Sequence, residues 1–104
     1  MSIRTCRQDI TAFAYDKRGR LLAVGQNSYV KTHRLQAYYG RKAGRPGRIF
    51  LHAELDALIK GSKRGTIHKL FVMRKGANRY LPCKPCPSCM LAINDYNVKV
   101  LEYT

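Results

Sequence analysis

The chain has 104 residues, of which 45% are hydrophobic, so it suits one small globular domain and is too apolar for a disordered chain. No apolar run approaches the roughly 18–20 residues that a membrane span requires, and the N-terminal residues lack the apolar segment of a secretory signal. We therefore expect a single domain over residues 1–104 that works in the cytosol, with no membrane partner.

The charge balance indicates a negatively charged partner. Twenty Lys and Arg against six Asp and Glu give a formal net charge of +14, and no acidic residue lies between Asp16 and Glu54 or between Asp56 and Asp95. Because self-repulsion at this charge is costly, a polyanion or a phosphate-bearing substrate is favoured over a merely solubilising surface.

The N-terminal half predicts a β-hairpin, a loop and a helix. Residues 10–15 and 20–25 have strand composition and are joined by a turn at 16–19. Residues 26–49 are polar, basic and rich in glycine, which predicts a loop. Apolar residues at i, i+4, i+7 and i+8 then predict a helix that opens at Phe50 or Leu51 and stops at Gly61.

The C-terminal half alternates strands and helices. Residues 67–74 predict a buried strand, 76–85 a loop, 86–94 a helix and 98–103 a last strand. Strand–helix–strand repetition implies crossovers and a sheet with helices packed on it. The sequence therefore predicts an α/β sandwich.

The cysteines are clustered in a way that favours chemistry over disulfides. Three of the four lie close together, namely Cys83, Cys86 and Cys89, and Cys6 lies apart. In a reducing compartment such a cluster is more typical of a metal or catalytic site. Cys6 is expected to be a packed or free thiol.

Cys86 and Cys89 form a C-x-x-C on the first turn of the predicted second helix. Residues three apart on a helix are neighbours on one face, and the helix N-terminus lowers the pKa of a thiol there. Alone, the motif fits a redox pair, half of a structural zinc site or no function. Cys83 and Cys86 form a competing pair, but it would place Pro85 and Pro87 inside the helix.

His52 and Glu54 begin the first predicted helix. Two residues apart on an α-helix, they differ by about 200° and cannot share a face, although both can surround a metal at the helix mouth. His52 would then be the third ligand beside Cys86 and Cys89, leaving the fourth tetrahedral position for water, as in catalytic zinc sites. Glu54, not a ligand, can take the water's proton and deliver it to a substrate nitrogen.

His-x-Glu followed by Pro-Cys-x-x-Cys, here 52–54 and 85–89, is the signature of zinc nucleobase deaminases. On this motif, and on the Gly25–Asn27 strand end and the helix at 89–93 followed by a strand at 98–103, the chain resembles the cytidine/deoxycytidylate deaminase superfamily. Residues 27–33 are similar to short phage and bacterial members labelled dCMP deaminase-like. The resemblance implies a three-layer-type sandwich around a mixed sheet of about four strands, with Zn²⁺ as cofactor.

The resemblance also implies contacts to the substrate. Asn27 would hold the sugar, and the backbone N–H of Ala53 and a carbonyl near Cys83–Pro85 would read the base edge. His33 is a further candidate for facing the substrate, whereas His68 is expected to be structural. Basic loop residues would meet a phosphate, among them Lys31, Arg41 and Arg48.

Several further expectations follow from composition and resemblance. Tyr38, Tyr39 and Tyr80 could stack on a base or pack on the sheet. Relatives usually have a longer N-terminal helix and often continue beyond the last strand, so this chain looks like a minimal core. A homo-oligomer would then supply the missing wall of the pocket.

Three functions remain open from the sequence. The first is conversion of cytosine to uracil in a free nucleotide such as dCMP. The second keeps the chemistry but acts on cytosine or adenine in single-stranded DNA or RNA, including tRNA, which the charge of +14 suits. The third is a nucleic-acid-binding zinc module without catalysis, in which Glu54 would be dispensable.

Overall fold

The computed structural model describes residues 9–28, 30–44, 50–75, 80–81 and 85–103. They form five strands and three helices. In chain order these are β1 (Asp9–Tyr15), β2 (Leu21–Gln26), α1 (Arg34–Lys42), α2 (Ala53–Ser62), β3 (Lys69–Lys75), β4 (Tyr80–Leu81), α3 (Pro87–Asp95) and β5 (Val100–Tyr103).

The sheet is mixed and has the order β2–β1–β3–β4, with β5 paired to β3. β1 is antiparallel to both β2 and β3, whereas β5 is parallel to β3 after the crossover through α3. β1 occupies one edge of β3 along its whole length. The other edge of β3 is therefore shared by β4 and β5. The α/β fold with a mixed sheet and packed helices, as predicted, is thus present.

The hairpin turn is fixed by Asp16. Its Oδ1 accepts hydrogen bonds from the backbone N–H groups of Arg18 and Arg20, both at 2.9 Å. Gly19 has a φ of 83°, which an L-residue with a side chain rarely adopts. The predicted turn at 16–19 is confirmed by this arrangement.

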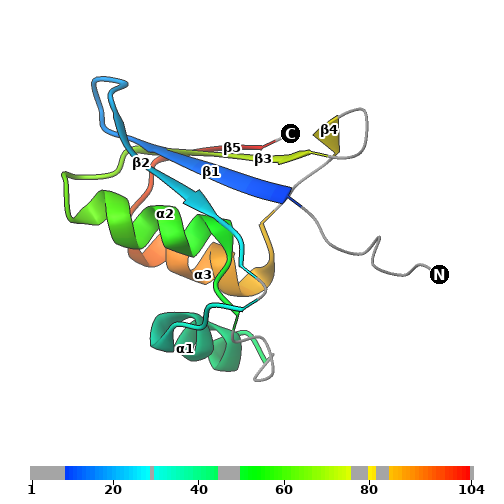
Figure 1. Ribbon diagram of the computed structural model, residues 1–104. Coiled ribbons are helices and arrows are strands. Elements are labelled where there is room, and N and C mark those ends of the chain that lie inside the picture. Colours follow the sequence, from blue (N-terminus) through cyan, green and yellow to red (C-terminus); the bar gives the residue numbers. More distant parts are fainter. Residues whose placement is uncertain (1–8, 29, 45–49, 76–79, 82–84, 104) are drawn as a thin grey trace.

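The helices lie on one face of the sheet (Figure 1), with α2 against the strands, α3 beside α2, and α1 beyond them against α3. Small and branched side chains of β1 and β3 face them and are fully buried, namely Ala12, Ala14, Leu70 and Val72. Leu55 and Leu58 of α2 and Ile93 of α3 complete this core. Within the described ranges no helix covers the opposite face.

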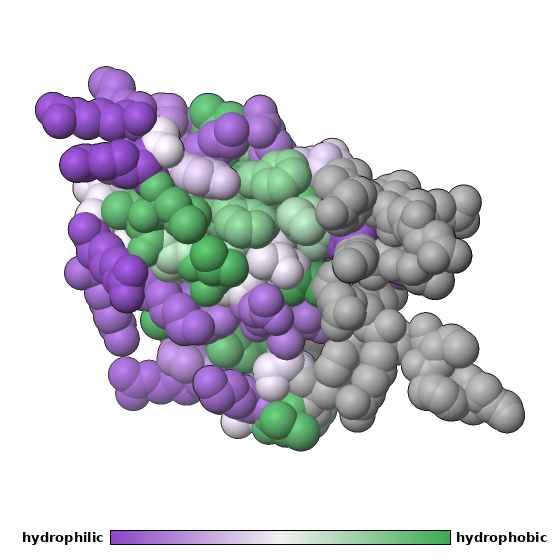
Figure 2. Space-filling model, turned by 45° about the horizontal axis from the view of Figure 1, so that its top comes forward, coloured by the Kyte–Doolittle hydropathy of each residue, from purple (hydrophilic) through white to green (hydrophobic). Residues whose placement is uncertain are grey.

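That opposite face carries an apolar patch, seen as the green region of Figure 2. Phe13 and Phe71 stack across β1 and β3 with ring centroids 6.1 Å apart. Val24 of β2 lies opposite Phe13 in the pairing of β1 with β2, and its side chain remains exposed.

The predicted loop over 26–49 is wrong in part because α1 forms within it. His33 caps this helix through Nδ1, which accepts a hydrogen bond from the N–H of Leu35 at 3.0 Å. The buried positions of α1 are Gln36, Tyr39 and Gly40. Two of these three residues are not hydrophobic, and the apolar residues with helical spacing, Leu35, Tyr38 and Tyr39, extend over little more than one turn.

Helix α2 begins at Ala53, later than the predicted Phe50 or Leu51. Thr32 and Phe50 form an antiparallel bridge, and the backbone of Leu51 bonds to Lys31 and Ser28. Residues 50 and 51 are therefore held in extended conformation before the helix starts.

Candidate metal centre

The N-termini of α2 and α3 meet, and each begins with a residue of the predicted metal set. His52 is the N-cap of α2 and Cys86 is the N-cap of α3, both with extended backbone. Neither side chain caps its own helix, in contrast to His33 on α1. Pro87 follows Cys86 in the first turn of α3, where its missing N–H and fixed φ suit a helix start.

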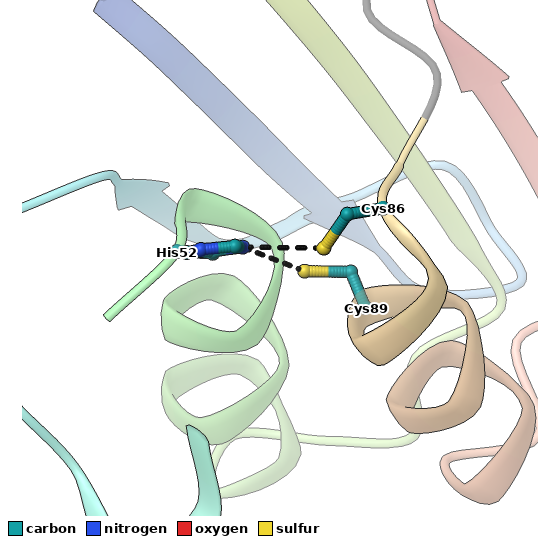
Figure 3. Close-up of side chains that lie close together, drawn as sticks. All are labelled: His52, Cys86 and Cys89. Carbon is teal, nitrogen blue, oxygen red and sulfur yellow. Dashed lines mark hydrogen bonds between the residues drawn. The ribbon is translucent and has the colours of Figure 1, made fainter. Parts of the chain in front are cut away.

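His52, Cys86 and Cys89 point toward one another (Figure 3). The Nδ1 atom of His52 lies 3.3 Å from Sγ of Cys89 and 3.4 Å from Sγ of Cys86. Zn–N and Zn–S bonds of about 2.0 and 2.3 Å at a tetrahedral angle place N and S roughly 3.5 Å apart. The three donor atoms, which all lie within 4.8 Å of one another, therefore fit a zinc ion.

The two thiols differ in proton affinity. A hydrogen bond from Cys89, together with those from His52 and Ser88, lowers the pKa of Cys86 to about 3. The same bond to Cys86, together with burial, raises the pKa of Cys89. One sulfur is thus already a thiolate near neutral pH, the form that ligates metals.

Glu54 lies beside this group without belonging to it. It is the second residue of α2 and only 4% exposed. Burial raises the pKa of its carboxyl, and the charges of His52 and Cys86 also act on it. A buried carboxyl with raised proton affinity next to a metal-binding group is suited to acid–base chemistry.

The relation between His52 and Glu54 differs from the predicted one. The figure of about 200° holds for two helical residues, but His52 has φ −89° and ψ 155°, so it precedes the helix. Its ring can therefore extend over the helix mouth toward Cys89, while Glu54 in the first turn is close enough to interact with the Cys89 thiol.

Two positioning residues were missed by the sequence analysis. Gln36 of α1 is 1% exposed, and its Oε1 accepts a hydrogen bond from the backbone N–H of His52 at 3.1 Å. Ser88 is buried with Oγ 3.1 Å from Sγ of Cys86. Ser88 lies inside the C-x-x-C motif and could have been found there, whereas Gln36 falls in a stretch that carries no metal-site pattern.

Asn27 and His33, the predicted side-chain contacts to substrate, each have a structural partner. The Oδ1 of Asn27 accepts a hydrogen bond from the backbone N–H of Ile10 at 3.0 Å, at the end of β2. Nδ1 of His33 accepts the α1 capping bond. Their roles toward a substrate stay predictions.

Ala53 and Pro85, two of the residues predicted to offer backbone groups to the base, directly adjoin metal ligands, and their role toward a base stays a prediction. Ala53 is the buried first residue of α2, where a backbone N–H has no acceptor within its own helix. Pro85 is buried and directly precedes Cys86. Cys83 lies outside the described residues.

The remaining candidates lie further from this centre or cannot be placed. Tyr39 is buried, and its hydroxyl donates to Oδ2 of Asp95 at 2.9 Å, so it packs rather than presenting its face to a base. Tyr38 is exposed and makes an edge contact with Tyr39. The side chain of Tyr80 is not described, and Arg48 and Cys6 lie outside the described residues.

None of the helices among the described residues could span a bilayer. No curated protein matches the chain significantly. Residues 2–104 match the family model of the cytidine and deoxycytidylate deaminase zinc-binding region. With the His52, Cys86 and Cys89 group able to hold a metal ion, the chain belongs to this zinc-binding deaminase family.

Proposed function

We propose that this protein is a zinc-dependent hydrolase that converts cytosine to uracil in a free nucleotide such as dCMP. The observation that carries the proposal is the buried carboxyl of Glu54, with raised pKa, beside three converging metal ligands. A closed structural zinc site has four protein ligands and requires no such acid. Among the described residues three ligands converge, as in catalytic sites.

The reaction adds water to C4 of cytosine and releases ammonia. His52, Cys86 and Cys89 would hold the metal, which when bound would supply Lewis-acid activation of the attacking water. Glu54 would accept one proton of that water and pass it to N3 of the base. It would then accept the remaining proton from the oxygen now bonded to C4 and deliver it to the departing amine, as the bond between C4 and that nitrogen breaks. The balance is cytosine plus water to uracil plus ammonia.

The surroundings of the site support binding of a nucleotide. The N–H of Ala53 is oriented as a first-turn donor that a base oxygen or nitrogen can use. Lys31 is exposed, and its backbone carbonyl accepts from the N–H of Leu51, which places it next to His52. Lys31, with Arg41 and Arg48, would meet the phosphate.

The test is chromatography of dCMP after incubation with the zinc-loaded protein. Glu54→Gln keeps the shape of the side chain and removes the acid, and Glu102→Gln makes the same change at an exposed carboxyl of β5. We expect dUMP with the wild type and with Glu102→Gln, and a loss of at least 100-fold with Glu54→Gln, within the range that general acid–base catalysis contributes. Absence of dUMP from the wild type would contradict the mononucleotide substrate.

Single-stranded nucleic acid is the second candidate substrate, favoured by the net charge of +14. A strand that contacts several Lys and Arg side chains loses affinity steeply as salt is added, whereas a mononucleotide loses little. Turnover of cytosine or adenine in an oligonucleotide, with a steep salt dependence and none of dCMP, would support this candidate. Nucleic-acid binding that survives Glu54→Gln, without turnover of any base, would instead favour a non-catalytic zinc module.

A further inference from the structure

A cleft of about 720 Å³ opens at the end of the β1–β2 hairpin. Its walls are the β1–β2 turn, the beginning of β2, the loop that follows α2 and the loop that follows α3. The volume lies within the range of small-ligand sites. We call it the basic cleft because five cationic side chains line it, Lys17, Arg18, Arg20, Arg64 and Lys99.

The basic cleft is separate from the metal centre. His52 and Cys86 stand at the N-terminal ends of α2 and α3, whereas Arg64 and Lys99 follow their C-terminal ends. A helix of the length of α2 spans about 15 Å. The substrate pocket around Glu54 therefore lies at one end of these helices and the basic cleft at the other.

The cations of the basic cleft exceed what the fold needs there. Among the described residues that line the cleft, Asp16 is the one carboxylate, and Nε of Arg20 lies 2.9 Å from its Oδ2. The C-terminal ends of α2 and α3 each contribute about half a negative charge. Neutralising all three groups still leaves about three positive charges to act on a ligand.

The cations are also held on a fixed scaffold. The turn that carries Lys17 and Arg18 is closed by the side chain of Asp16. The backbone N–H of Lys99 donates to the carbonyl of His68 at 2.9 Å, which fixes the opposite wall. The backbone that carries these cations is therefore ordered before an anion binds, and binding has only the long side chains left to order.

The basic cleft is also lined by apolar residues. These are Leu21, which is 52% exposed, Leu22 and Ile67. Cationic and apolar side chains in one cleft suit a phosphate backbone whose bases are unstacked and free to contact apolar surface. The bases of a duplex are stacked and paired, so a duplex would contact only the Lys and Arg side chains of the basic cleft. Hydrophilic side chains gather around this end of the molecule, at the left of Figure 2.

We propose that the basic cleft binds single-stranded nucleic acid, with its phosphates on the Lys and Arg side chains and a base against Leu21 and Leu22. The site is distinct from the metal centre and does not depend on the deaminase activity proposed above.

The test is fluorescence anisotropy of a labelled oligothymidylate of about twelve nucleotides, a length that several cations can track. Thymine has no exocyclic amine, so turnover cannot intervene. Lys17→Gln with Lys99→Gln removes two charges from the basic cleft. Arg34→Gln with Lys42→Gln removes two exposed charges from α1 and is the matched control. Circular dichroism establishes that both variants are folded.

We expect the cleft variant to lose at least fivefold in affinity, with the slope of log K against log salt reduced by about 1.4, or about 0.7 per lost phosphate contact. The α1 variant should keep the wild-type slope. Equal weakening of both variants would overturn the proposal, since the net charge alone would then bind the strand.

Competitors separate the strand from other anions. Unlabelled oligothymidylate should displace the probe at lower concentrations than polyglutamate of equal charge, the corresponding duplex or dTMP. Displacement by polyglutamate at the same concentration would make the basic cleft a general anion surface. Displacement by dTMP at the same nucleotide concentration would make it a mononucleotide pocket. Either result overturns the proposal.

Discussion

Gly25 of β2 lies where the strand touches the beginning of α2, and Gly25→Ala tests whether this contact positions the metal centre. A Cβ on Gly25 would fall 2.9 Å from Cα of Ala57, and closer still to the carbonyl oxygen of Ala53 and the nitrogen of Ala57. All three are backbone atoms of α2, so no side-chain rotation relieves the overlap. The substitution must push apart β2 and the helix that begins with His52 and Glu54.

The expected cost follows from this geometry. Where no steric conflict arises, replacing Gly by Ala usually raises the free energy of unfolding by about 0.4–1 kcal/mol, because Ala reduces the conformational freedom of the unfolded chain. Overpacking of a tight core lowers the free energy of unfolding by about 1–3 kcal/mol. Because the atoms that the new Cβ meets belong to the backbone of α2 and cannot rotate away, we expect Gly25→Ala to cost about 3 kcal/mol or more. For about 100 residues this lowers the melting temperature by roughly 12–24 °C, at about 4–8 °C per kcal/mol.

Gly65→Ala is the matched control. Its Cβ would meet only the side chain of Leu22, with Cδ2 at 3.2 Å, and that side chain can rotate away. We expect a change within about 0.5 kcal/mol. Urea and thermal unfolding followed by circular dichroism, with zinc content measured by a chromogenic chelator, compare the two. Wild-type stability and zinc content in Gly25→Ala, or equal losses in both variants, would refute the close-packing argument.

Three further predictions concern the metal centre and its support. Gln36→Met removes the acceptor of the backbone N–H of His52 and should lower the free energy of unfolding by about 1–3 kcal/mol. Zinc binding, measured by competition with a chelator, should weaken roughly tenfold, and unchanged zinc affinity would show that Gln36 is dispensable. Tyr39→Phe should cost about 1 kcal/mol at pH 7 in urea unfolding, because it removes a hydrogen bond to a solvent-exposed carboxylate. Burial, together with Asp95, raises the pKa of Tyr39 to about 12, from 10.0; the neutral tyrosine therefore stabilises the fold below pH 10, and this contribution falls between pH 10 and 12 in the wild type but not in Tyr39→Phe. Zinc at about a thousand times its Kd should stabilise the wild type by about 4 kcal/mol in thermal unfolding, an increment that chelation and Cys89→Ser should both abolish; an equal increment in Cys89→Ser would contradict the ligand assignment.

The elements that the sequence predicts well are those with regular apolar patterns. The hairpin, β3, α2 and α3 all lie within a few residues of their predicted positions. Helix α1 was missed because its buried face carries Gln36, a polar residue that is there to bind the backbone of His52. The apolar residues with helical spacing in α1, Leu35, Tyr38 and Tyr39, cover little more than one turn, and the polar, basic and glycine-rich residues around them favour a loop when only the local sequence is considered.

The chemistry of the metal group could be predicted from residue types and spacing, but its geometry could not. The C-x-x-C pair fixes two ligands on one turn, because three-residue spacing on a helix brings them together. The place of His52 depended on where α2 begins, and that is decided by the bridge between Thr32 and Phe50 from another part of the chain. Because His52 precedes the first helical residue of α2, the angle of about 200° between two helical residues does not apply to His52 and Glu54.

His52 and Cys86 both occupy N-cap positions, which places the metal centre where the N-termini of α2 and α3 meet. A side chain that caps its own helix, as His33 does, contributes about 1 kcal/mol, and His52 and Cys86 forgo this on α2 and α3. In exchange, the first-turn N–H groups of two helices face the same small volume, and their positive ends favour a thiolate there. Metal binding can restore the lost stability, because a bound ion stabilises only the folded chain. The same two helix starts thus lower the stability of the metal-free protein and provide the electrostatic setting that the ligands require.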